Sequence, residues 1–314
     1  MNQKGIGVSN LPNLKYRSVC KQGLDFNIMT IGTHGIGKSS FINSLFDSHL
    51  LIDDDSSNFQ IYTFSLVENE FKTNITLTEV DNYGDSSDNS NCWERITKYI
   101  KDCFKDYFEK EKQNVRNLIV DKRIHVCFYF LEPNINFIRQ SDLITMKEIS
   151  KHCNLIPIVG KCDLLNENQI AECYKFLRNT FEENGIFVFE ESSQKDSIEE
   201  FYPPYFLVCP DKEGRQIREY SYGSVQVKDI ITNDLYRIRD QIINKNVIDL
   251  IENTEEYYDK FRAVILYNQI NTKVNSNINK ELFNTDISKD LKDEEETIKE
   301  LQQRISEKKA MLNN

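Results

Sequence analysis

The chain has 314 residues, which is enough for one large domain or two small ones. It carries 39 basic and 50 acidic side chains, a formal net charge of −11, and this balance argues against a general nucleic-acid binder, which would need a basic surface. Hydrophobic residues make up only 39% of the sequence, so part of the chain is expected to be solvated helix or tail rather than core.

No membrane-spanning run and no apolar leader are visible in the sequence. No stretch approaches the ~20 apolar residues that cross a bilayer, and the first residues, MNQKG, are polar. The 8 Cys and 4 His are scattered, without a C-x-x-C or H-E-x-x-H pattern. We therefore expect a cytoplasmic protein with reduced thiols and no metal site built from His and Cys.

Apolar runs alternate with helical patterns along most of the chain. Residues 1–22 lack periodicity and predict an irregular N-terminal arm. The runs expected to form strands are Ile28–Ile31, Ile75–Val80, His125–Leu131, Leu155–Val159 and Pro204–Val208. Apolar residues between 93 and 108 recur at helical spacing. This alternation predicts an α/β fold with a central, mainly parallel sheet covered by helices on both faces.

A glycine-rich loop, Gly32–Ser39 (GTHGIGKS), follows the first strand and precedes a helical run. The spacing is that of a P-loop NTPase, in which backbone N–H groups and the helix N-terminus hold phosphates. Lys38 would reach the β- and γ-phosphates, and Ser39 would bind Mg²⁺. A chance strand–turn–helix is the alternative. The predicted phosphate-binding residues are Gly32, His34, Gly35, Ile36, Gly37, Lys38, Ser39 and Ser40.

Asp81 to Gly84 follow the next strand with D-x-x-G spacing. A carboxylate here can hold magnesium through water, and a glycine N–H can meet the γ-phosphate. We therefore predict Asp81 on the metal side together with Ser39, and we add Gly84 to the phosphate-binding set. Because Asp and Gly also favour turns, a simple turn stays open as the alternative.

Lys161 and Asp163 follow the buried strand Leu155–Val159. The Lys stem can lie along a purine, and the Asp carboxylate can accept two N–H donors that guanine offers together and adenine does not. Combined with the P-loop, this pattern predicts GTP or GDP, with Mg²⁺, as the ligand. A solvated Lys/Asp loop is the alternative.

The C-terminal segment differs in character. From Ile287 on there is no Gly or Pro, and Leu291, Ile298, Ile305 and Leu312 are spaced by sevens. This predicts a short coiled coil, because so polar a helix is marginal alone; a charged surface helix is the alternative. We divide the chain into an arm at 1–22, a nucleotide-binding domain at 23–270, and a linker with a short coiled coil at 271–314.

Five segments resemble the septins, a cytoskeletal family of GTP-binding proteins. They are Phe26–Phe46, Gly84–Trp93, Asp121–Cys127, Asn154–Asp163 and Arg218–Val227. The last, REYSYGSVQV, is similar to the septin-specific element R-x-Y-P-W-G-x-V-x-V. The resemblance runs from about residue 20 to 270. It implies a Ras-like GTPase domain with a septin-specific element at about 205–262.

The resemblance implies roles for four further residues. Arg218 and Cys209 would flank the guanine base, and Arg218 would also couple the nucleotide to the neighbouring subunit. Tyr222 stands where the family usually has Trp at the nucleotide-side subunit interface, and His125 is assigned to an interface as well.

Three departures from the family pattern surround the predicted site. Asn58 stands where hydrolysing septins have a switch threonine. Thr63 and Ser57 are the nearby substitutes, but the alignment with the family favours neither of them. Counted from Asp81 to Asp85, this chain has two residues fewer than the family motif D-T-P-G-x-G-D. Cys209 and the proline after it replace a glycine beside the base. We therefore expect nucleotide to bind and hydrolysis to be slow or absent, with the catalytic residue unknown.

The predicted function is that of a guanine-nucleotide-binding, septin-like subunit. By resemblance it would join other septin-like subunits in hetero-oligomeric filaments, a cytokinesis scaffold at the cell cortex or septum. Lys15, Arg17 and Lys21 would meet anionic lipids weakly, and no nucleic acid is expected. Three alternatives stay open: an active GTPase switch, a P-loop nucleoside kinase or ATPase, and a degenerate subunit that binds no nucleotide.

Overall fold

The computed structural model describes residues 23–46, 59–68, 71–81, 83–84, 89, 91–112, 120–190, 202–210, 217–220, 223–226 and 233–271. The chain divides into two compact units, Met1–Tyr258 and Asp259–Asn314. The predicted N-terminal arm and coiled coil lie outside the described residues, as do Ser57, Asn58 and Tyr222. The predicted boundary after residue 270 stays a prediction.

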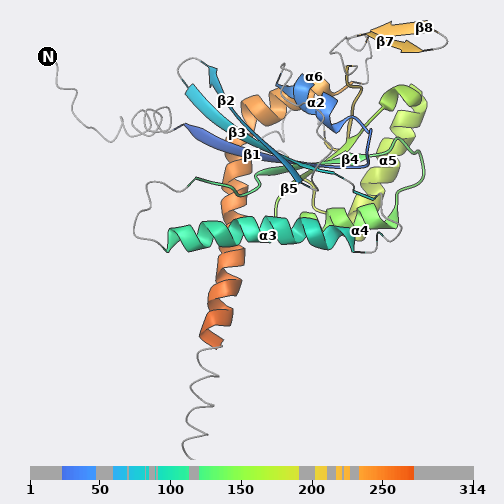
Figure 1. Cartoon of the computed structure of the whole chain (residues 1–314). Coiled ribbons are helices and arrows are strands. Elements are labelled where there is room, and N and C mark those ends of the chain that lie inside the picture. The colour runs from blue at the N-terminus through green and yellow to red at the C-terminus, as the bar shows by residue number, and fades with distance from the viewer. Residues whose placement is uncertain are drawn as a thin grey trace, which may run out of the picture. The chain divides into compact units, whose positions relative to one another are not determined.

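The first unit is built on a six-stranded sheet (Figure 1). Its strands are β1 (Leu24–Ile31), β2 (Phe59–Glu68), β3 (Phe71–Val80), β4 (Val126–Leu131), β5 (Asn154–Val159) and β6 (Tyr205–Phe206). In space they follow the order β2-β3-β1-β4-β5-β6, and every neighbouring pair is parallel except the antiparallel pair of β2 and β3. The predicted α/β fold with a mainly parallel sheet is confirmed.

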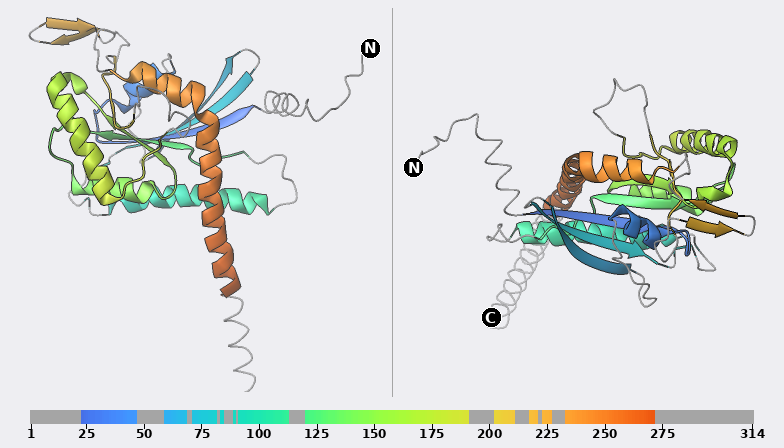
Figure 2. Two further views of the ribbon diagram at one scale, coloured as in Figure 1. Left: turned by 180° about the vertical axis from the view of Figure 1, so that it is seen from behind. Right: turned by 90° about the horizontal axis from the view of Figure 1, so that it is seen from above.

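Helices cover the two faces of this sheet (Figure 2). They are α2 (Lys38–Leu45), α3 (Cys92–Glu111), α4 (Gln140–Ile149), α5 (Glu167–Asn184) and α6 (Leu235–Ile238). Helices α3 and α4 lie together on one face, whereas α2 and α6 lie on the other (Figure 1). A π-helix, Arg239–Lys245, follows α6, and residues 247–271 are helical.

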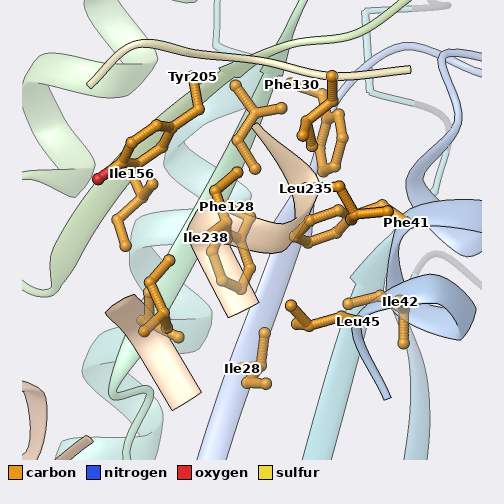
Figure 3. Packing of buried hydrophobic residues seen from close by; sticks show 14 of the residues in the cluster. Ile28, Phe41, Ile42, Leu45, Phe128, Phe130, Ile156, Tyr205, Leu235 and Ile238 are labelled. Atoms are coloured by element: carbon orange, nitrogen blue, oxygen red, sulfur yellow. The ribbon is translucent and has the colours of Figure 1, made fainter. Parts of the chain in front are cut away.

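The core between α2, α6 and the sheet is aromatic and branched aliphatic (Figure 3). Phe41 of α2 meets Phe128 and Phe130 of β4 edge to face, with ring centroids 5.1 and 5.4 Å apart. Burial of each such ring contributes about 1.5–3 kcal/mol. Because this packing fixes α2 against β4, it also fixes the loop that leads into α2.

A buried charge cluster lies where the chain enters β4. The Arg123 side chain is 2% exposed, its guanidinium binds Asp121 and Glu255 (each 2.7 Å), and it lies 3.8 Å from the centre of the Tyr107 ring. Burial alone would raise the pKa of Asp121, but the His125 ring 3.5 Å away and hydrogen bonds from Arg123 hold it well below its usual range. The cluster joins the helix that starts at 247 to α3 and to the start of β4.

Two short strands form a separate hairpin after β6. Strands β7 (Ile217–Tyr220) and β8 (Gly223–Gln226) pair antiparallel and together make a two-stranded sheet. They overlap the segment Arg218–Val227, which resembles the septin-specific element.

The second unit is described only at residues 259–271, which are helical. On this helix Val264, Tyr267 and Ile270 are 60–65% exposed. None of the helices that the structure describes combines the length and apolar character needed to cross a bilayer.

Candidate functional site

The glycine-rich loop joins the end of β1 to the start of α2. Gly35 and Gly37 have positive φ angles of 72° and 112°, and a Cβ at either would meet nothing within 4 Å. Backbone conformation rather than crowding therefore requires glycine at both positions. Gly37 is the N-cap of α2 and offers no side chain to the first N–H groups of the helix. An anion is the natural partner for these donors.

The end of β5 packs directly against this loop. A Cβ at Gly160 would lie 2.9 Å from the carbonyl oxygen of Ile36. The neighbouring strand β4 is equally close to the loop, since a Cβ at Gly32 would lie 2.7 Å from the Cβ of Phe130. Neither position tolerates a larger residue without backbone movement. The close approach brings the segment that begins at Gly160, with Lys161 and Asp163, beside the glycine-rich loop, although the two are far apart in sequence.

Lys38 is folded back into the loop rather than extended into solvent. The residue is 6% exposed, and its Nζ donates to the carbonyl of Gly32 (3.1 Å) and lies within 3.4 Å of the carbonyl of Thr33. The carboxylate Oε1 of Glu79 lies 3.9 Å from the same nitrogen. Lys38 therefore holds its positive charge at the centre of the loop.

Glu79 also faces Ser39, the other predicted ligand-binding side chain. The Ser39 hydroxyl donates to Glu79 Oε1 at 3.2 Å and lies 3.4 Å from Oε2. Glu79 is 6% exposed and stands opposite Thr30 of β1, two residues before Gly32. Asp81, the predicted metal-side residue, lies just beyond β3, where its carbonyl accepts a hydrogen bond from Arg95 (3.2 Å).

Sequence reasoning missed Glu79, although motif length could have found it. When the first Asp of D-T-P-G-x-G-D is matched to Glu79 instead of Asp81, residues 79–85 fit the motif without a gap. Tyr83, Gly84 and Asp85 then match its last three positions. This register places Asn82, outside the described residues, at the glycine expected to meet the γ-phosphate.

Gly84 lies beside the glycine-rich loop. Its φ is 79°, and a Cβ there would lie 3.9 Å from Cγ2 of Thr33 and 3.8 Å from a guanidinium nitrogen of Arg139. Arg139 pairs with Glu132, which accepts a hydrogen bond from the Thr33 hydroxyl at 3.4 Å. The segment after β3 thus reaches the phosphate end of the site.

Tyr83 anchors that segment in the protein interior. Its hydroxyl lies 2.7 Å from the hydroxyl of Tyr129, 2.8 Å from Oγ1 of Thr145 and 3.3 Å from a carboxylate oxygen of Asp142. Burial raises the pKa of both tyrosines well above the ordinary value, so both remain hydroxyls at physiological pH. The residue before Gly84 is therefore fixed to β4 and α4.

The predicted base-reading residues occupy a strained turn after β5. Lys161 is exposed and has a φ of 55°, the left-handed region that non-glycine residues seldom adopt. Asp163 is half-buried in the 3-10 turn Cys162–Leu164. The N–H of Cys162 donates to the carbonyl of Leu207 (3.1 Å), which ties the turn to the segment carrying Cys209. Cys209 itself is packed in the core, 6% exposed.

The remaining predicted residues are scattered. His34 is exposed, Ile36 is buried and Ser40 is half-buried. Arg218 lies on β7, opposite Val225. His125 is fully buried, accepts the N–H of Asn27 at Nδ1 (2.9 Å) and stacks on Phe26. Its side chain therefore offers no surface to a partner, contrary to the interface role expected for it.

Thr63, considered above as a substitute for the switch threonine of the family, lies away from the glycine-rich loop. It lies exposed in mid-β2, opposite Thr76, which in turn is opposite Asn27 of β1. Asn27 precedes Gly32 by five residues, or about 16 Å along the strand. The register therefore places Thr63 away from the loop.

The oxygen donors at the loop fit magnesium. A serine hydroxyl and a carboxylate are ligands that Mg²⁺ accepts when substrate phosphates and water complete its shell. Within the described ranges, no group of three or more His, Cys, Asp or Glu side chains could hold a metal alone. The Ser39 hydroxyl beside the Glu79 carboxylate suits a cation that shares its remaining ligands with a phosphate and water.

Comparison with known proteins gives a consistent result. The family model described as Septin matches residues 22–277. Cell division control protein 3 of Encephalitozoon cuniculi is 40% identical over 98% of this chain and 94% of its own length. Cell division control protein 10 of Saccharomyces cerevisiae is 32% identical over 82% of this chain and 88% of its own length. A septin GTPase domain from Chlamydomonas reinhardtii has the same fold, with a TM-score of 0.62 at 18% identity over 77% of this chain and 99% of that one. The chain belongs to the septin family.

Proposed function

We propose that this chain is a guanine-nucleotide-binding septin subunit that assembles with other septin subunits and uses its nucleotide structurally, with little or no hydrolysis. The observation that carries the proposal is the packing of Gly160 on Ile36, which sets the Lys161–Asp163 turn beside the phosphate loop. A single ligand with a purine at one end and a polyphosphate at the other spans such a pair of sites.

The phosphate end is held by charge and by oriented amides. Lys38 supplies a buried positive charge, and the uncapped N-terminus of α2 supplies N–H donors. Ser39 and Glu79 are the side chains that would hold Mg²⁺, which when bound neutralises phosphate charge. Together these groups bind and orient a nucleoside di- or triphosphate.

The base end favours guanine over adenine. In this proposal the Asp163 carboxylate accepts the ring N–H and exocyclic amine of guanine, which form two adjacent donors. Adenine lacks this pair and would leave the carboxylate unsatisfied, and sites of that kind discriminate strongly. In this proposal the aliphatic stem of Lys161, at a left-handed backbone position, lies along the base.

The sequence and the described fold both support slow hydrolysis. By the family resemblance Asn58 stands at the position of the switch threonine, and Thr63 lies in mid-β2. Tyr83 fixes the segment after β3 to Tyr129 and Thr145. A switch must exchange two loop conformations, and this anchored segment opposes that exchange. The active GTPase switch is therefore the less favoured of the two candidate functions.

Assembly at a septum or cell cortex is the remaining part of the proposal. It is supported by relatives whose names place them in cell division control. Exposed apolar residues on the described helix of the second unit, at 264, 267 and 270, favour pairing with another chain. The lipid contact of the N-terminal arm stays a prediction.

The direct test replaces the base-reading carboxylate. Asp163→Asn should weaken GDP binding at least about tenfold, because one acceptor becomes a donor facing the guanine N–H groups. Asp102→Asn on the exposed face of α3 is the matched control and should leave the affinity unchanged. Fluorescence titration measures both. Unchanged GDP affinity in Asp163→Asn, or equal binding of ATP by the wild type, would contradict the proposal.

Hydrolysis is tested separately with a single turnover of GTP and Mg²⁺. We expect the bound triphosphate to persist for many minutes. Conversion within a minute would favour the active switch and leave the nucleotide site intact.

A further inference from the structure

We propose that the outer edge of β2 pairs with β2 of a second copy of this chain, antiparallel and centred on Phe64, so that two sheets join into one. The contact is made by backbone hydrogen bonds between two identical strands, and the side chains of each strand set the register. The inference goes beyond the proposed function, because this pairing does not depend on nucleotide.

Strand β2 lacks the features that ordinarily keep sheet edges apart. It is the last strand on its side of the described sheet, where it pairs with β3 (Figure 1). That pairing runs over 10 residues without a bulge. From residue 59 to residue 67 the strand contains no charged residue and no proline. Soluble proteins usually protect an edge by charge, proline, a bulge or short length, so this edge is available to another strand.

Both faces of β2 leave apolar surface at this edge. On the outward face, Ile61 and Val67 are 57% and 67% exposed. On the core face, Tyr62, Phe64 and Leu66 pack against the core but are only half-buried. A strand alongside β2 would remove part of both sets from water, which favours pairing.

The sequence of β2 is nearly symmetric about Phe64. In an antiparallel pair centred there, each residue faces one of its own kind: β-branched apolar, large apolar or hydroxyl, with Phe64 opposite itself. The facing pairs are Ile61 and Val67, Tyr62 and Leu66, and Thr63 and Ser65. Aromatic pairs and hydroxyl pairs are among those that stabilise antiparallel sheets. The strand is therefore complementary to a second copy of itself.

A second β2 also suits this edge better than the other edge strands of the described fold. Strand β6, at the opposite edge of the main sheet, has 2 residues, and β7 and β8 have 4 each. A head-to-tail contact between the two edges of the main sheet is therefore disfavoured, and the two-fold pairing closes at two copies. Residues 61–67 alone form a small interface beside the ~800 Å² per partner of a standard one, so we expect a weak dimer with a micromolar dissociation constant.

The main experiment places charges across the proposed pairing and measures the mean mass of the full chain by sedimentation velocity over a range of micromolar concentrations. Thr63→Lys/Ser65→Lys sets like charges opposite each other and should lower the mean mass below that of the wild type. Thr63→Glu/Ser65→Glu should do the same. An equimolar mixture of the two variants sets Lys opposite Glu and should restore the heavier species. Ala171→Lys/Asn179→Lys, at two exposed positions of α5, is the matched control and should associate like the wild type.

Cross-linking tests the register. In the pairing centred on Phe64, residues 63 and 65 of the two copies lie opposite each other, with Cα atoms about 4.5–5.5 Å apart, a span that a disulfide bridges. Thr63→Cys mixed with Ser65→Cys should therefore form a covalent dimer in air. Either variant alone brings its new thiols together only as a diagonal pair, about 7–8 Å apart, and should cross-link far less. Asp102→Cys on α3 is the control for random collision.

Three results would overturn the proposal: a wild type that stays monomeric, a lysine variant that associates like the wild type, or a mixture no heavier than its components. Equal cross-linking of the mixture and of the single cysteine variants would refute the register. Thr63 and Ser65 are exposed, so the variants should fold, and circular dichroism checks that they do. If the lysine variant does not fold, the cross-linking experiment decides. The nucleotide proposal stands in each case, because it is tested by GDP binding.

Discussion

Asp234 is a residue whose burial gives the stability of the fold a pH dependence. Its carboxylate accepts the backbone N–H of Phe206 at 2.8 Å and lies 3.6 Å from the guanidinium of Arg237. Burial raises its pKa to about 6, above the ~3.9 of an unfolded chain. The native state therefore holds this proton more tightly than the unfolded state does.

We expect Asp234→Asn to remove this pH dependence. Between about pH 4 and 6 the unfolded wild type loses its proton first, so native stability falls as pH rises, and above pH 6 the loss is complete. The free energy of unfolding of the wild type, relative to that of the variant, should fall by about 2–3 kcal/mol across this window. Urea unfolding at a series of pH values measures it, and a pH-independent difference would disprove the prediction.

The residues of the site differ in how well the sequence predicted their placement. Lys38 and Ser39 lie where the motif places them, because glycine conformation and the start of α2 are local properties. Glu79 was not predicted because the motif was started at Asp81 instead of two residues earlier, and the pairing of β3 with β1 that brings Glu79 to Ser39 does not show in the sequence. The burial of His125 was missed for a similar reason, since its partners Asn27 and Asp121 meet it only in the folded chain.

Among the elements, the segment after β3 is attached to its neighbours through buried polar groups. The Tyr83 hydroxyl links β4, through Tyr129, to α4, through Thr145. Buried networks of this kind are costly to leave incomplete.

Tyr83→Phe should therefore lower the free energy of unfolding by about 1–3 kcal/mol, because it leaves buried hydroxyls without their shared partner. Tyr99→Phe is a suitable control. The hydroxyl of Tyr99 makes a longer contact, 3.4 Å to Thr78, and a weak one to the Cys103 thiol, so its loss should cost less. Denaturant unfolding compares the two, and equal stabilities of the two variants would refute the idea of an anchored segment.

The elements that the sequence predicted best were the buried ones. Strands β4 and β5 are apolar runs, buried at every residue, and both were predicted. Strand β2 was not predicted, although Tyr62, Phe64 and Leu66 on the core side alternate with exposed residues, which is the period of a half-buried strand. Its partner is β3 across a hairpin, so its identity as a strand depends on pairing as much as on its own composition.

At the scale of the whole molecule, the heptad segment that begins at Ile287 is expected to pair subunits. Replacing both Ile298 and Ile305 with Lys places charges in the predicted seam and should reduce the mass of the assembled species. GDP affinity should not change, because the predicted nucleotide-binding residues lie elsewhere in the chain. Analytical ultracentrifugation measures the mass, with Glu300→Lys, which lies at neither seam position of the repeat, as the control. An unchanged distribution of species would argue for a surface helix instead.

The central claim is that one site holds a guanine nucleotide by its phosphates at Lys38 and by its base at Asp163. The most direct measurement is the nucleotide released when the purified, folded protein is denatured, identified by chromatography. We predict guanosine di- or triphosphate at close to one per chain. Adenosine nucleotide, or a protein that carries no nucleotide and takes up none from an excess of GDP and magnesium, would contradict the account.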